Sequence, residues 1–181
     1  MTRQIRIVLA LGMACMCAAC SPVFDWRDVR VAPANAVAVL PCKKPDRVEH
    51  AIPLGGVPTP LNVAGCEAGG ATFALMAAVL PEGQPVDEIL AGWQQATLDN
   101  MHADASSVKR LPFRPLGGLA LPHAQLLTMD GRQADGKPVR GQAAWTAHEA
   151  ADGRMLLLHA VMYTQRKQDH AVDTFFETIR W

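Results

Sequence analysis

The first nineteen residues determine which part of this chain can fold as a domain. Arg3 and Arg6 make a short positive segment, and an apolar run over residues 7–14 follows it. A charged start, an apolar run of about 7–15 residues and then small residues is the pattern of a secretory signal. The run is too short to cross a membrane as a helix, which needs about 20 apolar residues. We therefore expect residues 1–19 to be a signal peptide that is removed.

Three cysteines lie at the end of this segment, in "CMCAAC" over residues 15–20. The stretch "AAC" ending at Cys20 resembles the lipobox of bacterial lipoprotein signal peptides, although Cys17 stands where Leu is usual. The resemblance implies diacylglycerol on the sulfur of Cys20 and an acylated amino group, and stable anchoring requires at least two such signals. Ser21 follows, where an Asp would imply retention at the inner membrane. The resemblance thus implies the outer membrane, with the domain on its periplasmic face.

Two other interpretations of the cysteines stay open. The signal could be cut without lipidation. Alternatively, Cys15, Cys17 and Cys20 could hold a metal ion, but such a site needs a fourth ligand, and no His, Asp or Glu precedes Asp25. The lipoprotein interpretation accounts for the apolar run and the cysteine together, so it is the prediction that we carry forward.

Removal of the signal changes the charge and cysteine content of the chain. Loss of Arg3 and Arg6 leaves 15 basic residues against 17 acidic ones, a net charge near −2. This balance lacks the basic surface that nucleic acids require, so we expect no nucleic-acid partner. Beyond the lipidated Cys20, Cys42 and Cys66 remain, and two cysteines in an oxidising compartment favour one disulfide. Two buried free thiols, or a reactive one, are the alternative.

Apolar patterning along the remaining chain predicts strands, a helix, more strands and a second helix. The apolar stripe of residues 85–101, with Val86, Ile89, Leu90 and Trp93 at helical spacing, predicts one helix. The Phe-rich segment 169–180 predicts the other. Strands are expected over residues 37–40, 48–54, 61–66, 71–80, 108–113, 124–129, 141–148 and 154–163, with a tight hairpin at Gly69-Gly70.

This order of elements predicts an α+β fold. We expect a largely antiparallel sheet of about 6–8 strands with the two helices packed on it, similar to an α/β/α sandwich. The expected domain organisation is a signal peptide over 1–19, a lipidated N-terminus and tether over 20–36, and a single periplasmic domain over 37–181. Phe24 and Trp26 in the tether are expected to dock on the domain, because exposed aromatic pairs are costly.

The last predicted hairpin carries the strongest candidate cluster of functional side chains. Ala150–Gly153 are expected to join its two strands. Whichever register that loop takes, we expect alternation to place Trp145 on the core face with Leu156 and Leu158, and His148 and His159 together on the other face. Two histidines on neighbouring strands could share a metal ion. A third ligand is lacking, because Glu149 is expected to face the opposite way, so the pair His148 and His159 is only a weak metal candidate. We expect no metal and no other cofactor.

The element order and the closing Phe-rich helix resemble the PsbP-like and DcrB-like family of α/β/α sandwich domains over residues 37–181. The segment "FDWRDVR", followed by a strand ending in "LP", also resembles outer-membrane lipoproteins of Gram-negative bacteria. Neither resemblance transfers a catalytic residue. Membership of the first family implies an accessory or assembly role, by analogy of fold.

Three function classes follow from these observations. The leading expectation is a non-catalytic accessory or interaction module of the cell envelope, held to the membrane through Cys20 and contacting an envelope protein. The alternative is a domain that binds a small apolar ligand or lipid, which would need an apolar cavity between sheet and helices. An enzyme is the least favoured class, because the three serines of the chain lie in no nucleophile motif.

Overall fold

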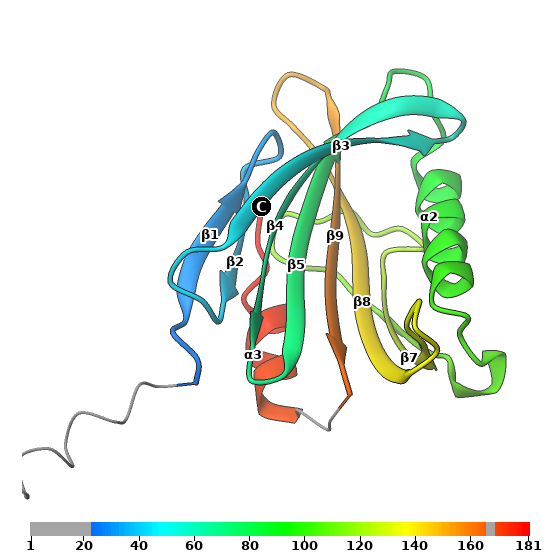
Figure 1. Cartoon of the computed structure of the whole chain (residues 1–181). Coiled ribbons are helices and arrows are strands. Elements are labelled where there is room, and N and C mark those ends of the chain that lie inside the picture. Colours follow the sequence, from blue (N-terminus) through cyan, green and yellow to red (C-terminus); the bar gives the residue numbers. More distant parts are fainter. Residues whose placement is uncertain (1–22, 166–168) are drawn as a thin grey trace, which may run out of the picture.

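The computed structural model describes residues 23–165 and 169–181 (Figure 1). Its centre is an antiparallel sheet of seven strands in the order β3-β4-β5-β9-β8-β7-β6, and β1 and β2 form a separate two-stranded sheet. The fold is therefore α+β, as the sequence predicts. The strands are β1 (Arg27–Val31), β2 (Ala36–Leu40), β3 (Asp46–Leu54), β4 (Val57–Ala68), β5 (Ala71–Val79), β6 (Lys109–Pro112), β7 (Gln125–Arg132), β8 (Pro138–Glu149) and β9 (Met155–Thr164).

Both predicted helices are present, with small differences at their ends. Helix α2 spans Val86–Asn100, a short 3-10 turn spans Ala105–Ser107, and α3 spans Asp169–Glu177. Asp87 and Glu88 lie in the first turn of α2, where acidic groups interact favourably with the helix dipole. Helix α3 ends earlier than expected because Arg180 leaves the helical path and forms bridges with Val37 and Leu116.

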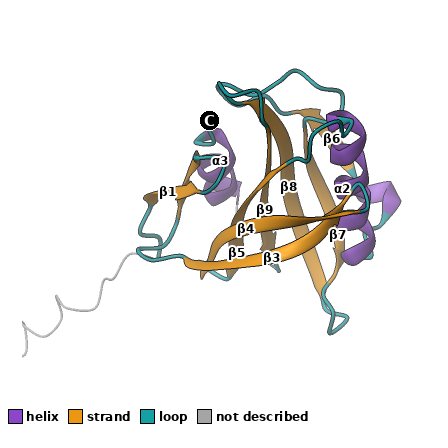
Figure 2. Ribbon diagram, turned by 90° about the horizontal axis from the view of Figure 1, so that it is seen from above, coloured by secondary structure: helices purple, strands orange, loops and turns teal. Residues whose placement is uncertain are grey.

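The sheet separates two layers (Figure 2). Helix α2 covers one face, and α3 covers the other together with the β1–β2 hairpin. A hairpin at Gly69-Gly70 joins β4 to β5, with Ala68 paired to Ala71. Both glycines have positive φ, at 60° and 75°, which is the conformation that a tight type I′ turn requires.

Strand β1 is the element that the sequence prediction missed, because residues 20–36 were expected to be a tether. Val29 and Val31 of β1 are buried, while Arg27, Asp28 and Arg30 are exposed. Phe24 and Trp26 also pack against the core, as predicted, and the Trp26 ring makes an edge contact with Phe73. The folded part of the chain therefore begins about ten residues earlier than expected. Residues 1–22, with the predicted signal peptide and the predicted lipidation site Cys20, lie outside the described residues.

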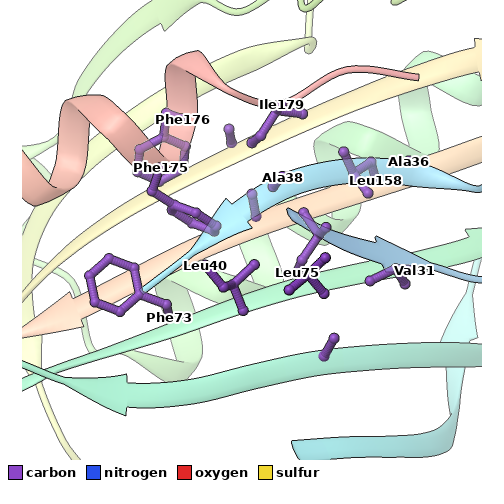
Figure 3. Close-up of a cluster of buried hydrophobic side chains, with 14 of the residues drawn as sticks. Val31, Ala36, Ala38, Leu40, Phe73, Leu75, Leu158, Phe175, Phe176 and Ile179 are labelled. Carbon is purple, nitrogen blue, oxygen red and sulfur yellow. The ribbon is translucent and has the colours of Figure 1, made fainter. Parts of the chain in front are cut away.

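The α3 side of the sheet has an aromatic and aliphatic core (Figure 3). Phe175 is fully buried and makes edge-to-face contact with Phe73, with ring centroids 5.5 Å apart. A disulfide joins Cys42, just after β2, to Cys66 in β4, with the Cα atoms 6.5 Å apart. It covalently joins the two-stranded sheet to the seven-stranded one, so the predicted disulfide is present.

The last hairpin differs from the sequence prediction in its register. Glu149 pairs with Met155, so the loop has five residues, and Trp145 pairs with His159. Since side chains alternate along a strand, one extra loop residue reverses which side chains share a face. Trp145 therefore lies with Leu157 and His159, not with Leu156 and Leu158. Both faces of this hairpin are buried, the Trp145 face under α2 and the other toward α3.

Candidate functional site

A groove lies where the β3–β4 hairpin bends against helix α2. The hairpin tip touches the start of α2 so closely that a Cβ on Gly55 would lie 2.5 Å from Cδ1 of Ile89 and 2.7 Å from Oε1 of Gln84. Gly55 also has a φ of +57°, a conformation that glycine adopts at no steric cost. A residue without a side chain is therefore needed where the hairpin meets the helix.

The groove beside this contact has a volume of about 450 Å³. One wall is the end of β3, with Ile52 and Leu54, and the other is α2, with Ile89 and Trp93. Glu88, Gly92, Ala96 and Asn100, all exposed, lie along the helix side of the opening. A Cβ placed on Gly92 would meet no atom within 4 Å, so the surface above this turn of the helix is open.

Beneath α2, the space between helix and sheet is filled by three rings. The imidazole of His159 stacks on the indole of Trp145, with centroids 4.4 Å apart, and contacts Trp93 at 5.1 Å. Trp145 and His159 are buried, whereas Trp93 is half-buried and also lines the groove. Trp93 thus has the core position that its helical spacing predicts, while part of it remains at the surface.

Burial controls the protonation of the central ring in this stack. Nδ1 of His159 donates a hydrogen bond to the carbonyl oxygen of Ala144, at 3.2 Å. Desolvation lowers the pKa of His159 to about 4, because burial disfavours the charged imidazolium. His159 is therefore neutral near pH 7 and serves as a flat packing element between two indoles.

The two histidines of the weak metal candidate lie on opposite faces of the sheet. His148 pairs with Leu156, and its ring stacks on Trp181 at 5.2 Å while Nδ1 donates to the carbonyl of Gly117 at 2.7 Å. His159 lies on the α2 side. The expectation that the two rings share a face is wrong, because the five-residue loop shifts the register. Within residues 23–165 and 169–181, no three His, Cys, Asp or Glu side chains are grouped so that they could hold a metal ion.

One polar cluster of the structure has no counterpart in the sequence prediction. Asp87 at the start of α2 accepts hydrogen bonds from the backbone N–H and from Nδ1 of His123, both at 2.8 Å. Nε2 of Gln94, about two helical turns later, donates to the carbonyl of His123 at 2.7 Å. These three bonds hold the loop before β7 against α2. Asp87 and His123 are 36 residues apart in the sequence, so no local sequence pattern indicates that they form a pair.

The groove was missed for the same reason. Gly92 and Ala96 are small, exposed residues outside the apolar stripe of α2, and Ile52 is one of several apolar residues of an alternating strand. Their juxtaposition depends on the bend of the β3–β4 hairpin, which is a tertiary feature. No helix among the described residues is both long and apolar enough to span a bilayer.

Comparison with known proteins identifies no matching family model, no matching curated protein and no matching solved structure. The resemblance to PsbP-like and DcrB-like domains therefore stays a prediction from the order of the elements.

Proposed function

We propose that this chain is a lipoprotein of the outer membrane, held through acyl chains on Cys20 with its domain in the periplasm. In this proposal the domain is a non-catalytic accessory subunit that contacts another envelope protein through the groove between α2 and the β3–β4 hairpin. The observation that carries the contact role is the groove itself, an open apolar surface above an interior filled with stacked rings.

The compartment is supported by two independent features. The signal-like segment with "AAC" at its end predicts export and lipidation. The disulfide between Cys42 and Cys66 is of the kind that persists in the periplasm and is rare in the cytosol. The second feature belongs to the folded domain and does not depend on how the first nineteen residues are interpreted.

The shape of the groove favours a protein segment as its occupant. It follows α2 from Glu88 to Asn100, a length of about 18 Å at 1.5 Å per residue. Its walls are apolar, while Glu88 and Asn100 place polar groups at its two ends. An apolar core inside a polar rim is the common composition of a protein–protein contact. A short segment of a partner that presents apolar side chains would fit this arrangement.

Photocross-linking in intact cells tests the contact. A photoreactive amino acid at Ala96, in the groove, should give a discrete adduct with an envelope protein, whereas the same group at Gln95, exposed on another side of α2, should not. Adding Gly92→Arg should abolish the Ala96 adduct without unfolding the domain, because the side chain enters open space. Equal adducts at Ala96 and Gln95, or an adduct that survives Gly92→Arg, would contradict the proposal.

One observation favours a second candidate function. A volume of about 450 Å³ lies within the range of about 300–1,000 Å³ that small-molecule sites occupy. If the Ala96 cross-linker captures a lipid or another small apolar molecule and no protein, the domain is a ligand-binding module.

The anchor is tested separately. Cys20→Ser should abolish labelling with a radioactive fatty acid and move the protein from the membrane fraction to the soluble periplasmic fraction. Unchanged membrane partitioning of Cys20→Ser would refute lipid anchoring at this residue. The cross-linking result does not depend on this outcome.

A further inference from the structure

The described chain enters the domain beside the β4–β5 turn. Phe24 lies so near Gly69 that a Cβ on this glycine would be 2.5 Å from Cζ of the Phe24 ring. The Phe24 ring in turn contacts Trp26, with centroids 5.6 Å apart, and Trp26 makes an edge contact with the buried Phe73. Two aromatic side chains thus fasten the start of the folded chain to the end of the sheet that carries Gly69-Gly70.

This attachment leaves a very short connection to the proposed lipid anchor. Cys20 and Phe24 are four residues apart in the sequence, and a fully extended chain spans at most about 3.6 Å per residue. The two Cα atoms are therefore within about 14 Å of each other. A tether over residues 20–36, as the sequence alone predicts, would have allowed a reach several times longer.

A distance this short limits how the domain can sit on a membrane. The polar headgroup region adds about 5–8 Å on each side of the hydrocarbon core, and an acylated cysteine has its backbone within that region. We propose that the end of the domain formed by Phe24, the Gly69-Gly70 turn and the adjoining end of β9 rests against the bilayer headgroups. This inference rests on the proposed lipidation of Cys20.

The surface at this end suits such a contact. A shallow hollow between the turn and the end of β9 is lined, among the described residues, by small and neutral polar side chains such as Thr72 and Gln165, with Glu67 as the one charged residue of that described lining. Val23, which precedes Phe24 in the chain, is 68% exposed. A hollow with this lining can approach headgroups without removing many of its own charges from water, which is the costly part of such contacts.

The orientation has a consequence for the groove. Strand β4 runs from Val57 to Ala68, about 36 Å at 3.3 Å per residue, and the β3–β4 turn and the Gly69-Gly70 turn lie at its two ends (Figure 1). The membrane-facing end and the groove are therefore at opposite ends of the sheet. The groove points into the periplasm, where a soluble partner or the periplasmic part of another envelope protein can reach it.

Fluorescence quenching on vesicles tests the orientation. The full lipidated chain, carrying a fluorophore on Thr72→Cys, is reconstituted in phosphatidylethanolamine and phosphatidylglycerol vesicles that contain a nitroxide-headgroup lipid. Ala151→Cys, exposed in the β8–β9 loop at the far end, is the matched control. Strong quenching at Thr72 with little at Ala151 is expected. Equal quenching at both sites, or none at Thr72, would overturn the proposal.

A spacer variant separates the tether from other causes. A twelve-residue Gly/Ser insertion between Ser21 and Pro22 adds about 19 Å of root-mean-square reach and should reduce quenching at Thr72 while the protein still floats with the vesicles. Undiminished quenching would overturn the claim that the short tether holds this end down. The intact mass of the protein reports lipidation independently, so a missing anchor is distinguished from a wrong orientation.

Discussion

The two faces of the seven-stranded sheet are covered in different ways, and the difference separates structure from proposed function. On one face, α3 and the β1–β2 hairpin enclose a core of phenylalanine and aliphatic residues, and the Cys42–Cys66 disulfide fixes the hairpin to β4. On the other face, α2 is the covering helix, and the groove opens beside it. We therefore expect the α3 face to contribute most of the stability of the fold, whereas the α2 face carries the groove that we propose as a contact surface.

Truncation of the α3-side core should have the largest effect. Phe175→Ala removes a fully buried ring that contacts both Phe73 and Phe176, and such a change costs about 3–5 kcal/mol. Urea denaturation would measure the loss in the free energy of unfolding. Asp173→Ala, an exposed change in the same helix, should stay within about 0.5 kcal/mol. A loss at Phe175 no larger than at Asp173 would contradict the idea that this face holds the fold together.

Removal of the disulfide should cause the second-largest loss in the free energy of unfolding. Replacing Cys42 and Cys66 by Ala opens a loop with a sequence separation of 24, which the chain-entropy account values at about 3.5 kcal/mol. The expected result is a lower free energy of unfolding with α2 and the groove unchanged. Hydrogen exchange should show faster exchange in β1 and β2 than in β8 and β9. Uniformly faster exchange would mean that the bridge supports both faces equally.

The ring stack on the α2 side should make stability depend on pH. The pKa of His159 falls from 6.5 in the unfolded chain to about 4 in the fold, so between these values the unfolded state binds more protons. The free energy of unfolding should therefore be unaffected by this group above pH 6.5. It should fall by up to about 3 kcal/mol as the pH decreases toward 4. Denaturation at several pH values measures it. His159→Phe keeps a flat ring and should flatten the profile in this window, and an unchanged profile would contradict the assignment.

These regions also differ in how far the sequence predicts them. The stripe from Val86 to Trp93 and the glycine pair Gly69-Gly70 are local signals, and both elements form where expected. The pairing of Cys42 with Cys66 could be predicted because few cysteines remain beyond the predicted signal peptide and Cys20. Strand β1 escaped prediction because only Val29 and Val31 of its five residues are apolar and buried, a pattern too short to stand out.

The errors in the candidate site have two physical origins, strand register and tertiary contact. Whether His148 or Trp145 faces α2 depends on a single residue in the β8–β9 loop, since a shift of one exchanges the two faces. In the structure the loop is Ala150–Arg154, with five residues. Nothing in its sequence distinguishes this loop from the four-residue loop Ala150–Gly153. The groove and the Asp87–His123 pair depend on how separate elements meet in space, which no periodicity records. Register and tertiary contact, not the identity of the elements, limit the prediction.

The smallest effect concerns the groove wall itself. Gly92 lies within α2, where glycine is less favourable than alanine by about 1 kcal/mol, and a Cβ there would touch nothing within 4 Å. Gly92→Ala should therefore raise the free energy of unfolding by about 0.5–1 kcal/mol, measured by urea denaturation.

Gly92→Ala also tests whether the α2 face serves for contact with a partner and not for stability. If the groove binds a partner closely, the added methyl group should weaken the Ala96 cross-link even though the domain is more stable, because stability and contact then have opposite requirements at this position. Gln95→Ala is the matched control, since it changes the same helix outside the groove. A stabilised Gly92→Ala domain with an undiminished cross-link would mean that the partner does not approach this turn of α2, and the contact would have to lie nearer to Ile52 and the hairpin tip.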